Sequence, residues 1–348
     1  MKFSLPAVLA PLAVLALPTE DAPPDAGPSP TPYPVFSVDR LFKDEGKVYF
    51  GASSDDGILE KGDTAAIISQ KFGQVTPEYS MKWGWIHPKR DYFEFQQADN
   101  LVRWAQENGD MVVRGHTLLW DNGLSTGLPT WVTDIKDPEN LTEVIETHVK
   151  TVVEHFKGKV RSWDVVNEPF NDNGTLKNTH FMDVLGEEYI GIAFRAAKAA
   201  DPDAKLYIND YNLEVVSYGK VGPVVDKVNQ WISEGIPIDG IGSETHLAPG
   251  FADEVQGALE RLADSNVSEV AITELDIDGA PPDQYATVAA ACLNVSKCVG
   301  VTVWGISDKD SWKADKKPLL FDENYEPKPA YWAIVEMLWQ RVKERGTK

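Results

Sequence analysis

EVAITELD at residues 269–276 is a short run of apolar and β-branched side chains that ends in acidic residues, and VRSWDVVNE at 160–168 has the same pattern. A run of this kind predicts a strand that is buried on both faces, as in a parallel sheet. Six further runs share it: VYFGAS (48–53), FGQVTPE (72–78), MVVRGHT (111–117), KLYIND (205–210), GIGSETH (240–246) and GVTVWGI (300–306). The sequence therefore predicts a regular series of eight strands.

The segments between these runs have the apolar spacing of helices. LTEVIETHVKTVVEHF at 141–156 and GEEYIGIAFRAAKAADP at 186–202 are the clearest, and Pro202 ends the second because proline cannot continue a helix. Strands that alternate with roughly eight helical connections predict an α/β fold, a single (β/α)8 barrel with a closed parallel sheet. A doubly wound open sheet is the alternative.

Polar residues close nearly every predicted strand. In a (β/α)8 barrel the catalytic groups lie at the carboxyl ends of the strands, so these side chains are expected to meet at one rim. One glutamate at a strand end means little, but convergence from many strands predicts a functional site. The residues at this rim are Glu78, His116, Asn167, Glu168, Asp210, Glu244, His246, Glu274, Asp276 and Trp304.

The sequence lacks the motifs of several enzyme classes. It has no HExxH, GxSxG or GxxxxGK and no GxGxxG before a helix, so zinc proteolysis, α/β-hydrolase chemistry and nucleotide binding have no support. A metal site of His116, His246 and Glu274 stays an alternative. Aromatic rings stack on sugars while carboxylates bind their hydroxyls, so an acidic rim with tryptophans predicts a glycoside hydrolase. The tryptophans expected there are Trp83, Trp120, Trp304 and Trp312.

Five motifs occur in order between about Val35 and Val342: EYSMKW (78–83), RGHTLLW (114–120), WDVVNEP (163–169), ITELDI (272–277) and WGISDKDSW (304–312). Together they resemble glycoside hydrolase family 10, the family of β-1,4-xylanases. The resemblance implies a retaining double displacement, with Glu168 as general acid and then base and Glu274 as nucleophile. Retaining enzymes hold these carboxyl groups about 5–5.5 Å apart, so Glu168 is expected to hold a proton while Glu274 stays ionised.

The resemblance also assigns supporting roles. Asn167 would bind the sugar 2-hydroxyl, and His246, itself fixed by Asp276, would orient Glu274. The remaining matched positions would bind substrate: Glu78, Lys82, His116 and Trp120 as the floor on the glycone side, and Trp304 and Trp312 as an aromatic lid.

Three positions depart from the family pattern. Tyr79 stands where Asn is usual, Asp121 where His is usual, and Glu244 where Gln is usual. Tyr79 adds a bulky ring to the floor, and Asp121 and Glu244 add acidic groups to the sugar site. If Glu244 is ionised, it would raise the pKa of Glu274 and oppose its attack; if it is protonated or paired with a cation, it could donate a hydrogen bond or bind a positive group.

Three functions are compatible with these residues. The first is hydrolysis of internal 1,4-β-D-xylosidic bonds of xylan. The second is tomatinase-like removal of the oligosaccharide from a plant saponin such as α-tomatine, because some family members are tomatinases and added negative charge would suit a cationic glycoalkaloid. The third is a non-catalytic carbohydrate-binding barrel, which the intact Glu168 and Glu274 disfavour. No cofactor is implied, and the expected partner is a β-linked glycan or glycoside.

The composition limits the partners further. The chain has 348 residues, 43% of them hydrophobic, with 54 acidic and 33 basic side chains and a net charge of -21. This excludes disorder for most of the chain. A strongly negative surface repels phosphate backbones and anionic lipids, so nucleic-acid and membrane-surface roles are not expected. We expect a monomer.

The chain ends predict export. Residues 1–17 match a cleavable secretory signal, 18–34 form a proline-rich linker or pro-segment, and 35–348 form the catalytic domain. In the extracellular space Cys292 and Cys298 are expected to form a disulfide. Four sequons are candidate glycosylation sites: Asn140, Asn173, Asn266 and Asn294.

Overall fold

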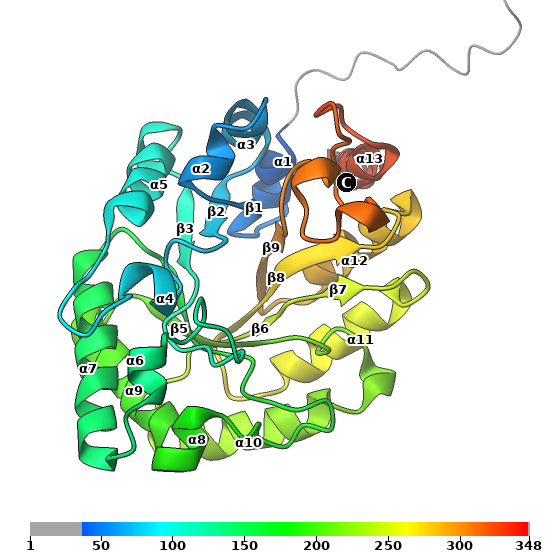
Figure 1. The fold of residues 1–348 in the computed structure, drawn as a ribbon. Helices are drawn as coiled ribbons and strands as arrows, with labels where there is room; N and C mark the ends of the chain where they lie inside the picture. The colour runs from blue at the N-terminus through cyan, green and yellow to red at the C-terminus, as the bar shows by residue number, and fades with distance from the viewer. Residues whose placement is uncertain (1–36, 347–348) are drawn as a thin grey trace, which may run out of the picture. The chain divides into compact units, whose positions relative to one another are not determined.

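Eight parallel strands close into a barrel in the computed structural model, which describes residues 37–346 (Figure 1). Each strand pairs with the next, and the last pairs with the first. The predicted (β/α)8 barrel is confirmed, and the open-sheet alternative is wrong because the sheet closes. In order around the barrel the strands are β1 (Tyr49–Ser54), β2 (Gln74–Pro77), β3 (Val112–Gly115), β4 (Ser162–Asn167), β5 (Lys205–Asp210), β6 (Gly240–Ser243), β8 (Glu269–Ile277) and β9 (Cys298–Val303).

The predicted strand at 240–246 is shorter in the structure. β6 ends at Ser243, and Thr245 has a φ of 66°, a left-handed conformation that a strand does not contain. The chain then forms a separate short strand, β7 (His246–Leu247), which pairs with β8 so that His246 lies opposite Asp276. This break sets the direction of His246 toward the site.

Helices cover the outside of the barrel (Figure 1). The two predicted helices are confirmed as α7 and α9, and α7 begins with an Asp137 cap followed by Pro138. The helices are α1 (Val38–Asp44), α2 (Asp56–Leu59), α3 (Thr64–Lys71), α4 (Trp83–Ile86), α5 (Gln96–Glu107), α6 (Thr130–Thr133), α7 (Pro138–His155), α8 (His180–Leu185), α9 (Glu188–Ala200), α10 (Val221–Ser233), α11 (Ala252–Ala263), α12 (Pro282–Asn294) and α13 (Pro329–Gly346), with 3-10 turns at Val216–Tyr218, Asp308–Asp310 and Ala314–Lys316.

Large buried rings occupy the space beside glycines on neighbouring strands, on the helix-facing side of the sheet for Trp163 and in the barrel interior for Tyr207. A Cβ at Gly115 would lie 2.1 Å from Cε3 of Trp163, and a Cβ at Gly240 would lie 2.5 Å from the ring of Tyr207. Any side chain at these positions would displace a buried ring. Both faces of the sheet are therefore closely packed at these positions, and the functional groups of such a barrel are expected at the carboxyl ends of the strands.

Cys292 at the end of α12 and Cys298 at the start of β9 form the predicted disulfide, with an S–S distance of 1.99 Å. The predicted signal and linker, residues 1–17 and 18–34, lie outside the described residues, and the domain boundaries stay predictions. Between residues 37 and 346 no helix is long and apolar enough to cross a membrane.

The four sequons stay candidate glycosylation sites. Asn173, Asn266 and Asn294 are exposed, and Asn140 is partly exposed at the start of α7, where it accepts a hydrogen bond from Arg90.

Candidate active site

A cavity of about 490 Å³ lies at the carboxyl ends of the barrel strands. It brings together residues from seven strand ends or the loops after them, and it includes both predicted catalytic glutamates and all of the predicted substrate-binding residues. The lining residues are Glu78, Tyr79, Lys82, His116, Trp120, Asn167, Glu168, Tyr211, Asn212, Glu244, His246, Glu274, Trp304 and Trp312. Tyr211 and Asn212, which follow β5, were not predicted.

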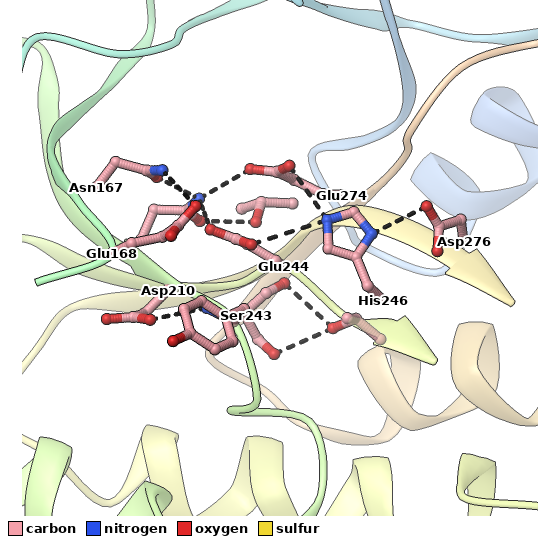
Figure 2. A network of polar contacts seen from close by, with 12 residues as sticks. Asn167, Glu168, Asp210, Ser243, Glu244, His246, Glu274 and Asp276 are labelled. Carbon is pink, nitrogen blue, oxygen red and sulfur yellow. Dashed lines mark hydrogen bonds and ion pairs between the residues drawn. The ribbon is translucent and has the colours of Figure 1, made fainter. Parts of the chain in front are cut away.

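Glu274 lies on β8 among donors that favour its ionised form. His246 Nε2 is 3.4 Å from one carboxylate oxygen, and Asn209 Nδ2 donates to the other at 3.0 Å (Figure 2). Burial opposes ionisation, but the contact with His246 and the charges of His116 and His246 outweigh it and lower the pKa of Glu274. Glu274 is therefore a carboxylate at neutral pH, which a nucleophile requires.

His246 is held between two carboxylates (Figure 2). Its Nδ1 lies 2.9 Å from Asp276, which also accepts hydrogen bonds from Trp312 Nε1 at 2.8 Å and Lys313 Nζ at 3.1 Å. Burial works against the positive charge, but Asp276 and Glu274 raise the pKa of His246 to about 9. An imidazolium with both ring nitrogens facing carboxylates fixes the position of Glu274.

Glu168 follows β4 in a left-handed conformation, with a φ of 51°. This conformation costs a non-glycine residue on the order of 1 kcal/mol and is held by the Glu168 N–H, which donates to Asn209 O at 2.8 Å. The carboxylate lies 3.2 Å from Lys177 Nζ and 3.4 Å from Asn167 Nδ2. The bent backbone turns Glu168 into the cavity, where it can exchange a proton with a bound substrate.

Asn209 is a central residue that sequence reasoning missed. Its amide nitrogen lies 2.9 Å from Asn167 Oδ1, 3.0 Å from Glu274 and 3.3 Å from Glu244, and its Oδ1 accepts a hydrogen bond from Thr273 at 2.7 Å. The available signal was its place near the end of KLYIND (205–210), next to Asp210, which the sequence places at the rim. Asn209 links the acid-base side of the cavity to the nucleophile side.

The surroundings of Glu244 favour the protonated one of its two possible states. It is 4% exposed, and burial, followed by the charges of Glu274 and Glu168, raises its pKa well above the ordinary value. A protonated Glu244 has nearly the shape of glutamine, the residue usual in the family.

Glu244→Gln is expected to remove a pH dependence of stability. Folded Glu244 keeps a proton that the unfolded chain releases above its ordinary pKa of 4.5, so the folded state loses stability as pH rises. The free energy of unfolding of the variant, minus that of the unmodified protein, should therefore increase by about 1.4 kcal/mol per pH unit until Glu244 ionises. Urea unfolding from about pH 5 to pH 8 measures this slope. Parallel curves for the two proteins would contradict it, and Glu143→Gln, an exposed change on α7, is the control.

Two other sequence interpretations are wrong. Asp121 does not line the cavity, because its carboxylate accepts hydrogen bonds from the backbone of His180 at 2.7 Å and Gly123 at 3.3 Å. Trp83 is fully buried rather than at the rim, and its ring stacks on His148 with centroids 3.7 Å apart. Neither residue lines the cavity.

The predicted floor residues share one wall of the cavity. Lys82 Nζ lies 4.7 Å from the centre of the Trp120 ring, and burial lowers the pKa of Lys82. Burial also raises the pKa of Glu78 to about 7. His116 Nδ1 lies 3.0 Å from Asp164, at the bottom of the cavity. The wall presents an ammonium, a carboxyl group and an aromatic face, which together suit a hydroxylated ring.

The metal-site alternative is not supported by the donor set. Candidate ligand atoms of Glu244, His246 and Glu274 lie within 4.8 Å of one another. However, both ring nitrogens of His246 face carboxylates, and its raised pKa describes an imidazolium, which has no lone pair for a metal. His116 Nδ1 lies nearer to Asp164, at 3.0 Å, than to Glu274, at 4.0 Å, and His116 is not part of this group.

The barrel and its cavity define a class of protein. Two glutamates at the ends of β4 and β8 face one aromatic-lined cavity, and one of them is held ionised, as in a glycoside hydrolase. The Glycosyl hydrolase family 10 model matches residues 37–337, and the chain belongs to this family.

The chain is also similar in sequence to endo-1,4-beta-xylanases of other organisms. An endo-1,4-beta-xylanase 3 of Hypocrea jecorina is 55% identical over 302 residues, covering 87% of this chain and 86% of the relative. An endo-1,4-beta-xylanase 2 of Claviceps purpurea is 46% identical, covering 86% and 90%.

Solved structures are also similar. Native xylanase 10B from Thermotoga maritima has a TM-score of 0.81 at 37% identity, covering 89% of this chain and all of that chain. Xylanase 10B from Thermotoga petrophila, in complex with xylobiose, has a TM-score of 0.81 at 36% identity, covering 88% and 98%.

Proposed function

We propose that the protein is a secreted, retaining endo-β-1,4-xylanase. The observation that carries the proposal is the pairing of an ionised Glu274, held by His246 and Asn209, with Glu168 in the same cavity. The similarity to endo-1,4-beta-xylanases over most of the chain supports xylan as the substrate.

The reaction follows from the positions of the two glutamates. Protonated Glu168 gives its proton to the glycosidic oxygen, and Glu274 attacks the anomeric carbon to form a covalent glycosyl-enzyme. Lys177, 3.2 Å from Glu168, stabilises the carboxylate that this step leaves. Glu168 then takes a proton from water, whose oxygen attacks the anomeric carbon and releases Glu274. Two inversions at one carbon retain the configuration.

A saponin glycosidase is the second candidate, and one feature favours it. Tyr79 lines the cavity and places a ring where the family usually has an amide. The charge argument for a cationic glycoalkaloid is weaker in the folded protein, because Asp121 does not line the cavity and burial raises the pKa of Glu244. Xylan is therefore the first proposal, and a non-catalytic barrel is disfavoured by the ionised nucleophile.

Hydrolysis of xylan and of α-tomatine, measured side by side, tests the proposal. We expect reducing sugar from xylan, no sugar release from α-tomatine, and a first product with β configuration in proton NMR. Sugar release from α-tomatine alone would replace the xylanase proposal with the saponin glycosidase. A first product with α configuration would contradict the retaining mechanism.

A further inference from the structure

Tyr79 and Trp85 form a pair of aromatic rings at the edge of the cavity, called here the aromatic platform. Their ring centroids are 5.0 Å apart with an interplanar angle of 46°. Tyr79 lines the cavity, whereas Trp85 lies beyond the lining and is 42% exposed. The platform therefore extends the aromatic surface of the cavity outward, on the wall that also carries Glu78 and Lys82.

The backbone around the platform is held in place. Trp85 lies on the short helix α4, where the Gly84 N–H donates to Thr126 O at 3.2 Å, and a Cβ at Gly84 would lie 2.0 Å from Ser125 O. The Tyr79 N–H donates to Asp55 at 2.8 Å. Both rings are carried by a fixed backbone, so little conformational entropy is lost when a ligand stacks on them.

We propose that Tyr79 and Trp85 form an additional sugar-binding subsite, which takes one pyranose unit of the same β-linked chain that fills the cavity. An exposed indole offers a flat apolar face, and the C–H face of a pyranose is the complementary surface. Continuity with the cavity through Tyr79 identifies the occupant as the next unit of the substrate chain. The inference rests on the proposed action on xylan.

If the platform binds a sugar unit, the increase of kcat/KM with the length of the substrate depends on Trp85. Short substrates fill the cavity without reaching the indole, whereas longer chains gain one stacked ring. Trp85→Ala should therefore lower kcat/KM for xylohexaose by roughly three- to tenfold and leave kcat/KM for 4-nitrophenyl β-xylobioside within about twofold. Trp85→Phe should keep a part of the lost activity, because it restores an aromatic face.

Trp332→Ala is the matched control. Trp332 is 40% exposed, and its ring centroid lies 5.3 Å from that of a tyrosine, Tyr331. It lies on α13, however, and does not line the cavity. Trp332→Ala should leave kcat/KM unchanged for both substrates. Equal losses on short and long substrates in Trp85→Ala, or no loss on either, would overturn the platform. Failure of the unmodified enzyme to cleave xylohexaose would instead overturn the proposed xylanase function.

Discussion

Glu274→Ala is expected to lower hydrolysis of 4-nitrophenyl β-xylobioside by roughly 10⁴- to 10⁶-fold, since it removes the atom that attacks the anomeric carbon. The cavity left by the side chain lies beside the His246 imidazolium, and an azide ion can enter it from the nucleophile's side. Azide should restore part of the activity and give the α-glycosyl azide, because only one inversion then takes place. Initial rates with and without azide, and NMR of the product, measure both effects.

The control for this variant is Glu143→Ala, which removes an exposed carboxylate on α7 and should keep full activity. Thermal unfolding of Glu274→Ala, compared with the unmodified protein, tests whether the barrel stays folded. A β-glycosyl azide from Glu274→Ala would exclude Glu274 as the nucleophile.

Glu168→Ala should lower activity on xylan by roughly 10²- to 10⁴-fold. Without a general acid the glycosidic oxygen is not protonated as the bond breaks, and this raises the barrier of the first step. A 2,4-dinitrophenyl β-xylobioside has a leaving group that needs no protonation, so its first step should stay fast in this variant. The glycosyl-enzyme should then accumulate, and a burst of dinitrophenol should be released. Azide, which needs no general base, should then speed turnover and give the β-glycosyl azide.

The opposite azide products separate the two glutamates within one experiment. Stopped-flow absorbance measures the burst, and steady-state rates on xylan measure the overall loss. Equal losses on xylan and on the dinitrophenyl substrate would contradict the acid-base role of Glu168.

The barrel and the two glutamates could be read from sequence because their signals are local. A β-branched run predicts a buried strand, and the residue that ends it lies at the rim. Glu168 ends one such run, and Glu274 lies two residues before the end of another. The break at Thr245 was missed, since a left-handed residue inside an apolar run leaves no periodicity signal.

Residues that act through distant partners were read less well. Trp83 belongs to the core because it stacks on His148, which comes from α7. His148 in turn lies 3.2 Å from His87 between their Nδ1 atoms, although the two histidines are 61 residues apart. No pattern along the chain reports such contacts.

The clearest difference between what the sequence determines and what the tertiary structure determines is the charge of the acidic side chains. The sequence by itself determined the strands, the barrel, the family resemblance and the positions of Glu168 and Glu274, because these depend on neighbouring residues. Only the tertiary structure decided that burial raises the pKa of Glu244 and that the Asp121 carboxylate faces a loop. For Glu274 it supplied the contact with His246 that accounts for the ionised state implied by the family resemblance. Those properties depend on burial and on charges brought close by folding, and both depend on distances in space rather than along the chain.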